Sequence, residues 1–221
     1  MPFPQAVLDR TASCARVLDA GGSFIPLPTA THIIDIVPPP AACKAAFIHH
    51  DMCRKPWPFS DKFFDFSYCS NTLEDIRDPI GACEELMRVS RAGFIATPSR
   101  LRETFHQKHG YRWRRIAGRP LRVGFGHHRW FCEWDGTTLS FLAKTDTFAY
   151  SSRHFITREE AGRDLTEDEA NLTFFWQDGF LAEERVLVGV GEIEAEFIRF
   201  KAEALGRLRG RDASPRPIAT A

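Results

Sequence analysis

The stretch A-R-V-L-D-A-G-G-S-F-I-P-L-P-T-A-T-H-I-I-D-I, residues 15–36, decides the fold of this chain. It holds two short apolar runs, 15–20 and 31–36, and the first run stops at the pair Gly21-Gly22. Such runs predict short strands, and the glycine pair predicts a tight turn after the first of them. Strands that are apolar along most of their length are typical of a sheet covered by helices on both faces.

The same pattern continues downstream. We predict further strands over 47–50, 64–69 and 94–97, and a helix that begins at Asp78-Pro79 and is closed by Ala92-Gly93. The helix is indicated by apolar residues at helical spacing and by a proline at its first position. This alternation of strands and helix predicts an α/β fold with a Rossmann-like open, mostly parallel sheet and flanking helices.

Beyond Pro98 the pattern changes. Two strand-like segments, 127–134 and 138–144, flank Asp135-Gly136, which is a two-residue hairpin signal, so we predict an added β-hairpin after strand five. The remaining predictions are a helix or capped loop over 157–171, a strand over 181–190, and a final helix over 191–208 that turns Ile193, Phe197, Phe200, Ala204 and Leu208 inward. Residues 209–221 are predicted to form a disordered tail.

The bulk composition is that of an ordinary globular protein. The 221 residues are 43% hydrophobic and 26% charged, which excludes a disordered or fibrous chain and fits one domain. The 29 basic and 29 acidic side chains cancel, so net charge requires neither nucleic acid nor a membrane as a partner. The six cysteines form no C-x-x-C pair and are expected to be reduced thiols. With no signal-peptide pattern and no long apolar run, we expect a cytoplasmic protein.

The charges are unevenly distributed along the chain. Between Pro98 and Arg129 there are nine basic residues and one acid, Glu103. The basic segment 100–122 also contains Tyr111 and Trp113, and cations beside aromatic rings suit a phosphate, a sugar nucleotide or single-stranded RNA. A solvated surface loop is the slightly preferred interpretation.

Acidic residues lie at or just after the ends of the first three predicted strands. Asp19 precedes the glycine turn, Asp35 ends the second strand, and Asp51-Met52 follows the third. A cofactor with an adenosine end and an amino-acid end needs a close glycine turn, a carboxylate for the ribose hydroxyls and a polar-plus-apolar pair for adenine. The order of these residues therefore favours a nucleoside cofactor, although each carboxylate alone could merely cap a strand or, at Asp51, a helix.

Five segments together carry a family resemblance. They are V-L-D-A-G-G (17–22), W-P-F-S-D-K-F-F-D-F (57–66), S-N-T-L-E-D-I-R-D-P (70–79), E-L-M-R-V-S-R-A-G (85–93) and F-I-A-T-P-S (94–99). The first half of the chain thereby resembles the class I S-adenosylmethionine-dependent methyltransferases of the type-11 group. It departs from that pattern in its first glycine loop, where 21–28 is a short connection broken by prolines instead of a helix, at Asp75, where the family usually has His, and at Ser90-Arg91.

The resemblance implies S-adenosyl-L-methionine as the cofactor and assigns roles to the residues above. Asp19 with Gly21 and Gly22 would hold the methionine end, Asp35 the ribose, Asp51 and Met52 the adenine, and Ser70 and Asn71 would border the methyl group. We expect a single methyltransferase-like domain over 1–208, with the cofactor-binding half at about 15–100 and the substrate-facing half at about 100–190.

The candidate catalytic residues are His127, His128 and Asp75. Histidine is the natural proton acceptor near neutral pH, and the pair begins the predicted hairpin of the substrate-facing half. No metal site is predicted, because His49, His50, His106, His109 and Cys132 show no compact ligand spacing.

The sequence thus predicts a methyltransferase acting on a hydroxyl or amine of a small-molecule or saccharide-like acceptor, with an anionic acceptor preferred. Two alternatives stay open. One is a catalytically inactive methyltransferase-like binding or regulatory module, and the other is an RNA-binding or RNA-modifying protein that uses segment 100–122. A membrane partner is not expected, nucleic acid is not favoured, and the oligomeric state is not predicted.

Overall fold

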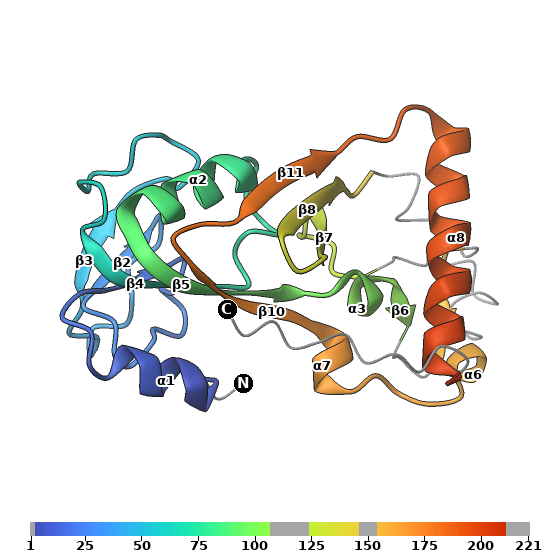
Figure 1. The fold of residues 1–221 in the computed structure, drawn as a ribbon, viewed down its shortest axis with the longest axis horizontal. Coiled ribbons are helices and arrows are strands. Elements are labelled where there is room, and N and C mark those ends of the chain that lie inside the picture. Colours follow the sequence, from blue (N-terminus) through green and yellow to red (C-terminus); the bar gives the residue numbers. More distant parts are fainter. Residues whose placement is uncertain (1–2, 107–123, 146–153, 211–221) are drawn as a thin grey trace.

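The computed structural model describes residues 3–106, 124–145 and 154–210. Its centre is a six-stranded sheet in the order β10-β5-β4-β1-β2-β3, parallel throughout except for β10, which runs antiparallel to β5 (Figure 1). The strands are β1 (Val17–Ala20), β2 (His32–Asp35), β3 (Ala46–His49), β4 (Phe64–Ser70), β5 (Ser90–Pro98) and β10 (Asn171–Gln177). The predicted Rossmann-like, mostly parallel α/β sheet is confirmed.

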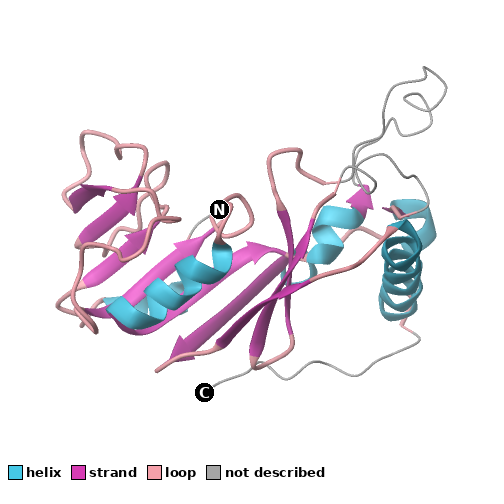
Figure 2. Cartoon of the chain, turned by 90° about the horizontal axis from the view of Figure 1, so that it is seen from above, coloured by secondary structure: helices cyan, strands magenta, loops and turns pink. Residues whose placement is uncertain are grey.

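The two faces of this sheet are covered by different helices (Figures 1 and 2). Helix α2 (Pro79–Val89) buries Cys83, Leu86 and Val89 on one face, and helix α1 (Gln5–Thr11) buries Val7 on the other. Neighbouring side chains of a strand point to opposite faces, so Leu18 packs with α2 whereas Val17 packs with α1.

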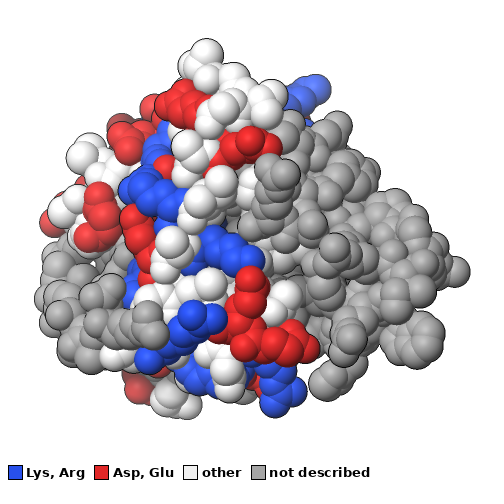
Figure 3. All heavy atoms as spheres, turned by 90° about the vertical axis from the view of Figure 1, so that its right-hand side faces the viewer, with Lys and Arg blue, Asp and Glu red and all other residues white. Residues whose placement is uncertain are grey.

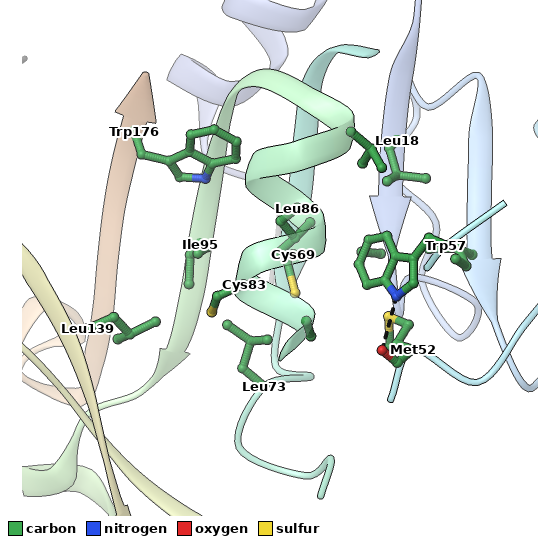
Figure 4. Close-up of a cluster of buried hydrophobic side chains, with 14 of the residues drawn as sticks. Leu18, Met52, Trp57, Cys69, Leu73, Cys83, Leu86, Ile95, Leu139 and Trp176 are labelled. Atoms are coloured by element: carbon green, nitrogen blue, oxygen red, sulfur yellow. Dashed lines mark hydrogen bonds between the residues drawn. The ribbon is translucent and has the colours of Figure 1, made fainter. Parts of the chain in front are cut away.

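The core beneath α2 is drawn in Figure 4. Leu18, Trp57, Cys69 and Leu86 are each at most 2% exposed there, and Ile95 is fully buried. This packing holds the four central strands in register, and it fixes where their ends lie.

Helix α2 begins as predicted, but the element after it was misplaced. Asp78 caps the helix through a hydrogen bond from the Gly81 amide, and the helix ends at Val89, where β5 begins directly. The prediction that Ala92-Gly93 closes the helix was wrong: Gly93 lies within β5. A Cβ atom at Gly93 would lie 2.6 Å from the Ser67 carbonyl oxygen and 2.7 Å from the Trp176 ring, so glycine is required by close packing.

The sequence prediction also missed a strand. Residues 171–177 form β10, where Phe174 and Trp176 are buried, Phe175 between them is half-buried, and Thr173 and Gln177 on either side are exposed. The segment before it, predicted as a helix or capped loop, forms α6 (Arg158–Ala161) and α7 (Glu167–Ala170), each started by a threonine capping box.

A smaller sheet, in the order β11-β8-β7, packs beside the carboxyl end of β5 (Figure 1). Strands β7 (Trp130–Trp134) and β8 (Thr138–Ala143) form the predicted hairpin, and β11 (Leu181–Arg185) runs parallel to β8. The connection is three residues long, 135–137, not two, and Asp135 Oδ1 stabilises it by accepting hydrogen bonds from the amide of Thr137 within it and of Thr138 at the start of β8. Strand β11 ends at Arg185, short of the predicted Val190.

The last helix, α8 (Val190–Leu208), stands at the far end of the molecule (Figures 1 and 2). Its predicted inward residues are confirmed: Phe197, Phe200, Ala204 and Leu208 are buried and Ile193 packs beside them. The end face of the molecule that Figure 3 shows carries acidic and basic side chains side by side. The short elements nearby are α3 (Arg100–Thr104), β6 (Phe105–His106) and β9 (Ile156–Thr157).

Several predictions fall partly or wholly outside the described residues. These are the disordered tail beyond residue 210 and most of the basic segment 100–122. Its first residue, Arg100, is described and is not part of a solvated surface, because it is 3% exposed and pairs with Glu196 at 2.9 Å. Among the described helices, none has the length and apolar character that crossing a bilayer requires.

Candidate functional site

The carboxyl ends of β1, β2 and β4 meet at one edge of the sheet. Parallel pairing aligns Asp19 with Tyr68 of β4 and Asp35 with His49 of β3, and Ser70 ends β4 beside them. In open parallel α/β sheets, ligands bind in the crevice at this edge. Asp19, Asp35 and Ser70, which the sequence assigned to a cofactor, therefore lie where open parallel sheets bind ligands.

Asp19 lies at the bottom of this edge. It is 1% exposed, its Oδ2 atom accepts a 2.7 Å hydrogen bond from the Leu27 amide, and its Oδ1 atom has no partner among the described residues. Burial, with the nearby charge of Asp35, raises the pKa of Asp19 to about 7 although the Leu27 amide lowers it. A buried carboxylate oxygen without a partner is unfavourable unless a ligand donor completes it.

The glycine pair lets the loop after β1 lie close against its neighbours. Gly21 has φ +81°, which favours glycine, and a Cβ atom there would lie 2.3 Å from Thr72 Oγ1. A Cβ atom at Gly22 would lie 2.0 Å from Asp19 Oδ2. The loop therefore rests directly on the Asp19 carboxylate and on the turn after β4. As expected from its prolines, residues 21–31 form no helix.

Asp35 is 8% exposed and turns its carboxylate toward the same loop. Its Oδ2 atom accepts from the Ser23 amide at 3.2 Å and its Oδ1 atom from the Val37 amide at 3.1 Å. Each carboxylate oxygen has two lone pairs, so capacity for two further donors remains. Beside it, Ile36 is 61% exposed. A carboxylate next to an uncovered apolar side chain suits a ribose and the base attached to it.

Of the third predicted pair, Asp51 lies at the surface and Met52 lies in the core. Asp51 Oδ1 accepts from the Cys53 amide at 2.9 Å, and this bond contributes most to lowering the pKa of Asp51, while Oδ2 pairs with Arg77 at 3.0 Å. It begins a turn, not the helix weighed as an alternative. Met52 is 7% exposed and packs in the core, where its carbonyl accepts from the Trp57 indole (Figure 4).

Ser70 and Asn71 border the edge from β4. Asn71 has φ +50°, and its amide donates to the Ala96 carbonyl at 2.9 Å, so the chain turns sharply away from the sheet at this point. Asn71 Nδ2 donates to Ser70 Oγ at 3.1 Å. Neither side chain is buried.

The three predicted catalytic residues converge just beyond this turn. One ligand atom each of Asp75, His127 and His128 lies within 4.8 Å of the other two. Two hydrogen bonds hold the histidine segment to the turn after β4, because the Glu74 carbonyl accepts from the amides of Arg129 at 2.7 Å and Trp130 at 3.2 Å. Residues some fifty positions apart in the sequence are thus brought together at the same edge as Asp19.

Glu103, which the sequence analysis did not select, lies behind this cluster. It is 1% exposed, and it accepts from His128 Nδ1 at 2.6 Å and from Lys144 Nζ at 2.6 Å. Burial raises the pKa of Glu103, but the hydrogen bond from His128 and the Lys144 ammonium outweigh it and lower that pKa overall. One sequence signal was available: Glu103 is the single acid among nine basic residues.

A hollow of about 450 Å³ opens over the histidines. The charged and aromatic side chains on its wall are those of Arg77, His127, His128, Arg129, Trp130 and Lys144. A site of this size with cationic side chains at its rim can take a small anionic molecule. Glu74, on the adjoining turn, is 1% exposed, and burial raises its pKa to about 8.

Residues 32–96 match the protein family described as Methyltransferase domain. The matched segment runs from the start of β2 into β5 and includes Asp35, Asp51, Ser70 and Asp75. The resemblance to the type-11 class I methyltransferases is confirmed over these residues, and S-adenosylmethionine is the cofactor that such a domain implies.

Among solved structures, the chain is similar to the YcgJ protein of Bacillus subtilis (18% identity, 42% of this chain and 50% of that chain, TM-score 0.33). It is also similar to a S-adenosylmethionine-dependent methyltransferase of Thermotoga maritima (16%, 57% and 61%, TM-score 0.39). A third similar structure is the plantazolicin methyltransferase BpumL, crystallised with S-adenosylhomocysteine (19%, 45% and 49%, TM-score 0.36).

These likenesses cover about half to three fifths of each of those chains. No curated protein matches the sequence.

Proposed function

We propose that the protein binds S-adenosylmethionine at the carboxyl edge of β1 and β2 and transfers its methyl group to a small-molecule or saccharide-like acceptor held beyond β4. One observation carries the proposal: the unpartnered Asp19 carboxylate oxygen lies directly under Gly22, at the same edge at which Asp75, His127 and His128 gather. A site for a cofactor and a site for a proton acceptor thus adjoin, with Thr72 between them, because it contacts Gly21 and its carbonyl accepts from the Asp75 amide.

The cofactor would be held by residues that fit its parts. Asp19 and the glycine loop would take the charged methionine end, and Asp35 the ribose hydroxyls. Ile36 would be covered by the adenine. Bound in this way, S-adenosylmethionine supplies a methyl group on a positively charged sulfur, which a nucleophile displaces directly.

The chain's own residues would align the acceptor and take its proton. The Glu103 carboxylate at 2.6 Å from His128 Nδ1 favours a proton on that nitrogen and leaves a lone pair on Nε2. His128 would accept the proton of an acceptor hydroxyl as its oxygen bonds to the methyl carbon, and the carbon–sulfur bond breaks to leave S-adenosylhomocysteine. A well-placed proton acceptor contributes about 10²–10⁴-fold to such a step.

The cationic rim of the hollow supports an anionic acceptor. Arg129 and Lys144 lie on its wall, and Arg77 reaches it while paired with Asp51. The chemical class of the acceptor, hydroxyl or amine, and the cytoplasmic location stay predictions from the sequence.

Calorimetric titration with S-adenosylhomocysteine tests the proposal. We expect one site per chain, and at least about tenfold weaker binding for Asp35→Ala, since a charged hydrogen bond to the ribose is worth roughly 1.5–3 kcal/mol. Asp9→Ala, an exposed aspartate on α1, is the matched control and should bind like the unchanged protein. No heat at millimolar ligand would overturn the proposal and favour the inactive binding module.

A further inference from the structure

We propose that Asp75, His127 and His128 form a binding site for a divalent transition-metal ion such as Zn²⁺ or Co²⁺. Their ligand atoms lie within 4.8 Å of one another, although the residues come from the turn after β4 and from the segment before β7. Two imidazole nitrogens with one carboxylate oxygen are a ligand set that these ions accept, whereas Mg²⁺ and Ca²⁺ prefer oxygen alone.

The distances are those of a site that closes on an ion. Asp75 Oδ1 is buried, has no hydrogen-bond partner among the described residues, and lies 3.9 Å from His128 Nε2. Ligands bound at about 2.0–2.2 Å from one ion are separated by roughly 3–3.5 Å. A small rotation of side chains therefore brings the two atoms to an ion, and the exposed His127 can turn to provide the third ligand.

The residues behind the ligands are arranged for metal binding. A histidine that binds a metal through one nitrogen usually donates its other N–H to a carboxylate, which fixes the ring and makes the ligand more basic. Glu103 does this for His128 at 2.6 Å, and Lys144 holds the other Glu103 oxygen at 2.6 Å. The ring of His128 is thus held with Nε2 directed toward Asp75.

The space around the cluster also suits an ion. Asp75 brings one negative charge to the ligand set, and the charge of Glu103 is paired with Lys144. Arg77 and Arg129 lie on the wall of the adjoining hollow, so the ion would be held by its ligands and not by the net charge around it. The hollow adjoins His127 and His128, so three protein ligands would leave coordination positions open toward it. An open position on a metal is where water or an oxygen of a small molecule binds.

An ion at His128 Nε2 would occupy the lone pair that the proposed base uses. The metal would instead lower the pKa of a bound acceptor hydroxyl, whose proton would pass to solvent water and not to the imidazole. This role in methyl transfer rests on the proposed function, whereas binding of the ion does not.

The test uses Co²⁺, whose visible absorption reports its ligands, added to protein that has been dialysed against a chelator. We expect one Co²⁺ per chain, displaced by Zn²⁺ and not by Mg²⁺. His127→Ala and Asp75→Asn should each weaken binding at least about tenfold, in line with the loss of one ligand. His49→Ala, an exposed histidine on β3, is the control and should leave binding unchanged.

The exposure of His127 keeps the test decisive, because its replacement removes no core contact; circular dichroism of each variant checks the fold. No Co²⁺ spectrum at millimolar metal, or a spectrum that His127→Ala and Asp75→Asn leave intact, would overturn the metal site. A titration with S-adenosylhomocysteine on the metal-free protein distinguishes the two proposals. Binding of Co²⁺ without binding of S-adenosylhomocysteine would contradict only the proposed function. Binding of S-adenosylhomocysteine without binding of Co²⁺ would contradict only the metal site.

Discussion

The two parts of the sheet's carboxyl edge are held together in different ways. At β1 and β2 the carboxylates are bound by nearby backbone: Asp19 and Leu27 are eight residues apart, and Ser23 and Asp35 are twelve apart. Beyond β4, Glu103 holds His128 and Lys144 from 25 and 41 residues away. The cofactor part therefore depends on a local loop, while the acceptor part depends on how the small sheet packs against the large one.

The largest effect should come from the long-range part. Glu103→Gln leaves the Lys144 ammonium, whose side chain is 6% exposed, without its carboxylate, and we expect a loss of about 3 kcal/mol in the free energy of unfolding. Urea denaturation measures it. Glu84→Gln is the matched control, because its partner Lys55 and Glu84 itself are 43% and 57% exposed, and the free energy of unfolding should stay close to that of the unchanged protein. If both variants lost the same free energy of unfolding, the buried pair of Glu103 with Lys144 would not stabilise the acceptor part.

The next effect concerns the local loop. Gly22→Ala places a Cβ atom 2.0 Å from Asp19 Oδ2, so the loop has to move away from the carboxylate that it covers. Moving this loop would break charged hydrogen bonds to the ligand, each worth roughly 1.5–3 kcal/mol, so we expect about 10- to 100-fold weaker S-adenosylhomocysteine binding by calorimetry. Gly191→Ala, in open space on α8, should change nothing. If Gly22→Ala left the affinity for S-adenosylhomocysteine unchanged, the loop after β1 would not be part of the cofactor site.

The buried Asp19 predicts that the cofactor part contributes to the pH dependence of stability. Its pKa is raised to about 7 in the folded chain, mainly by burial, while the unfolded chain titrates near 3.8. Between these values the folded state binds the proton and the unfolded state does not, so stability falls as pH rises from about 4 to 7. We expect Asp19→Asn to remove about 2 kcal/mol of the fall between pH 5 and pH 7, measured by urea midpoints. If the free energy of unfolding of Asp19→Asn fell with pH as steeply as that of the unchanged protein, the raised pKa of the buried Asp19 would be contradicted.

The smallest effect tests the uncovered apolar rim. Ile36 is 61% exposed beside Asp35, and covering it with adenine should contribute about 1 kcal/mol, so Ile36→Ser should weaken S-adenosylhomocysteine binding about fivefold. Leu181→Ser is the comparison, since Leu181 is 66% exposed on β11, in the small sheet. A similar change in both variants would show that the rim is not the adenine site.

The same contrast explains what the sequence could predict. Local sequence patterns predicted the strands up to β4, the start of α2, the hairpin and the inward face of α8. They failed at Gly93, where a glycine after a helix resembles a terminator but serves the packing of Ser67 and Trp176. They also missed β10, because its partner β5 lies some seventy residues away and only pairing makes it a strand.

The site divides in the same way. That Asp19, Gly22 and Asp35 lie close together could be predicted, because their neighbours in the sequence are also their neighbours in space. His128 was selected by its residue type, but Glu103 and Lys144 were not, since nothing in the local sequence places them against the imidazole. The roles of all these side chains in binding and catalysis stay proposals.

The central claim is that cofactor and acceptor sites adjoin across the turn after β4. Histidine ring signals in NMR spectra, recorded with and without S-adenosylhomocysteine, test it most directly. The ligand should shift the signals of His127 and His128, identified by their loss in His127→Ala and His128→Gln. It should not shift His32, which lies at the opposite edge of the sheet, at the start of β2. If the ring signals of both His127 and His128 stayed unshifted at saturating S-adenosylhomocysteine, the two sites would not adjoin and the account would be contradicted.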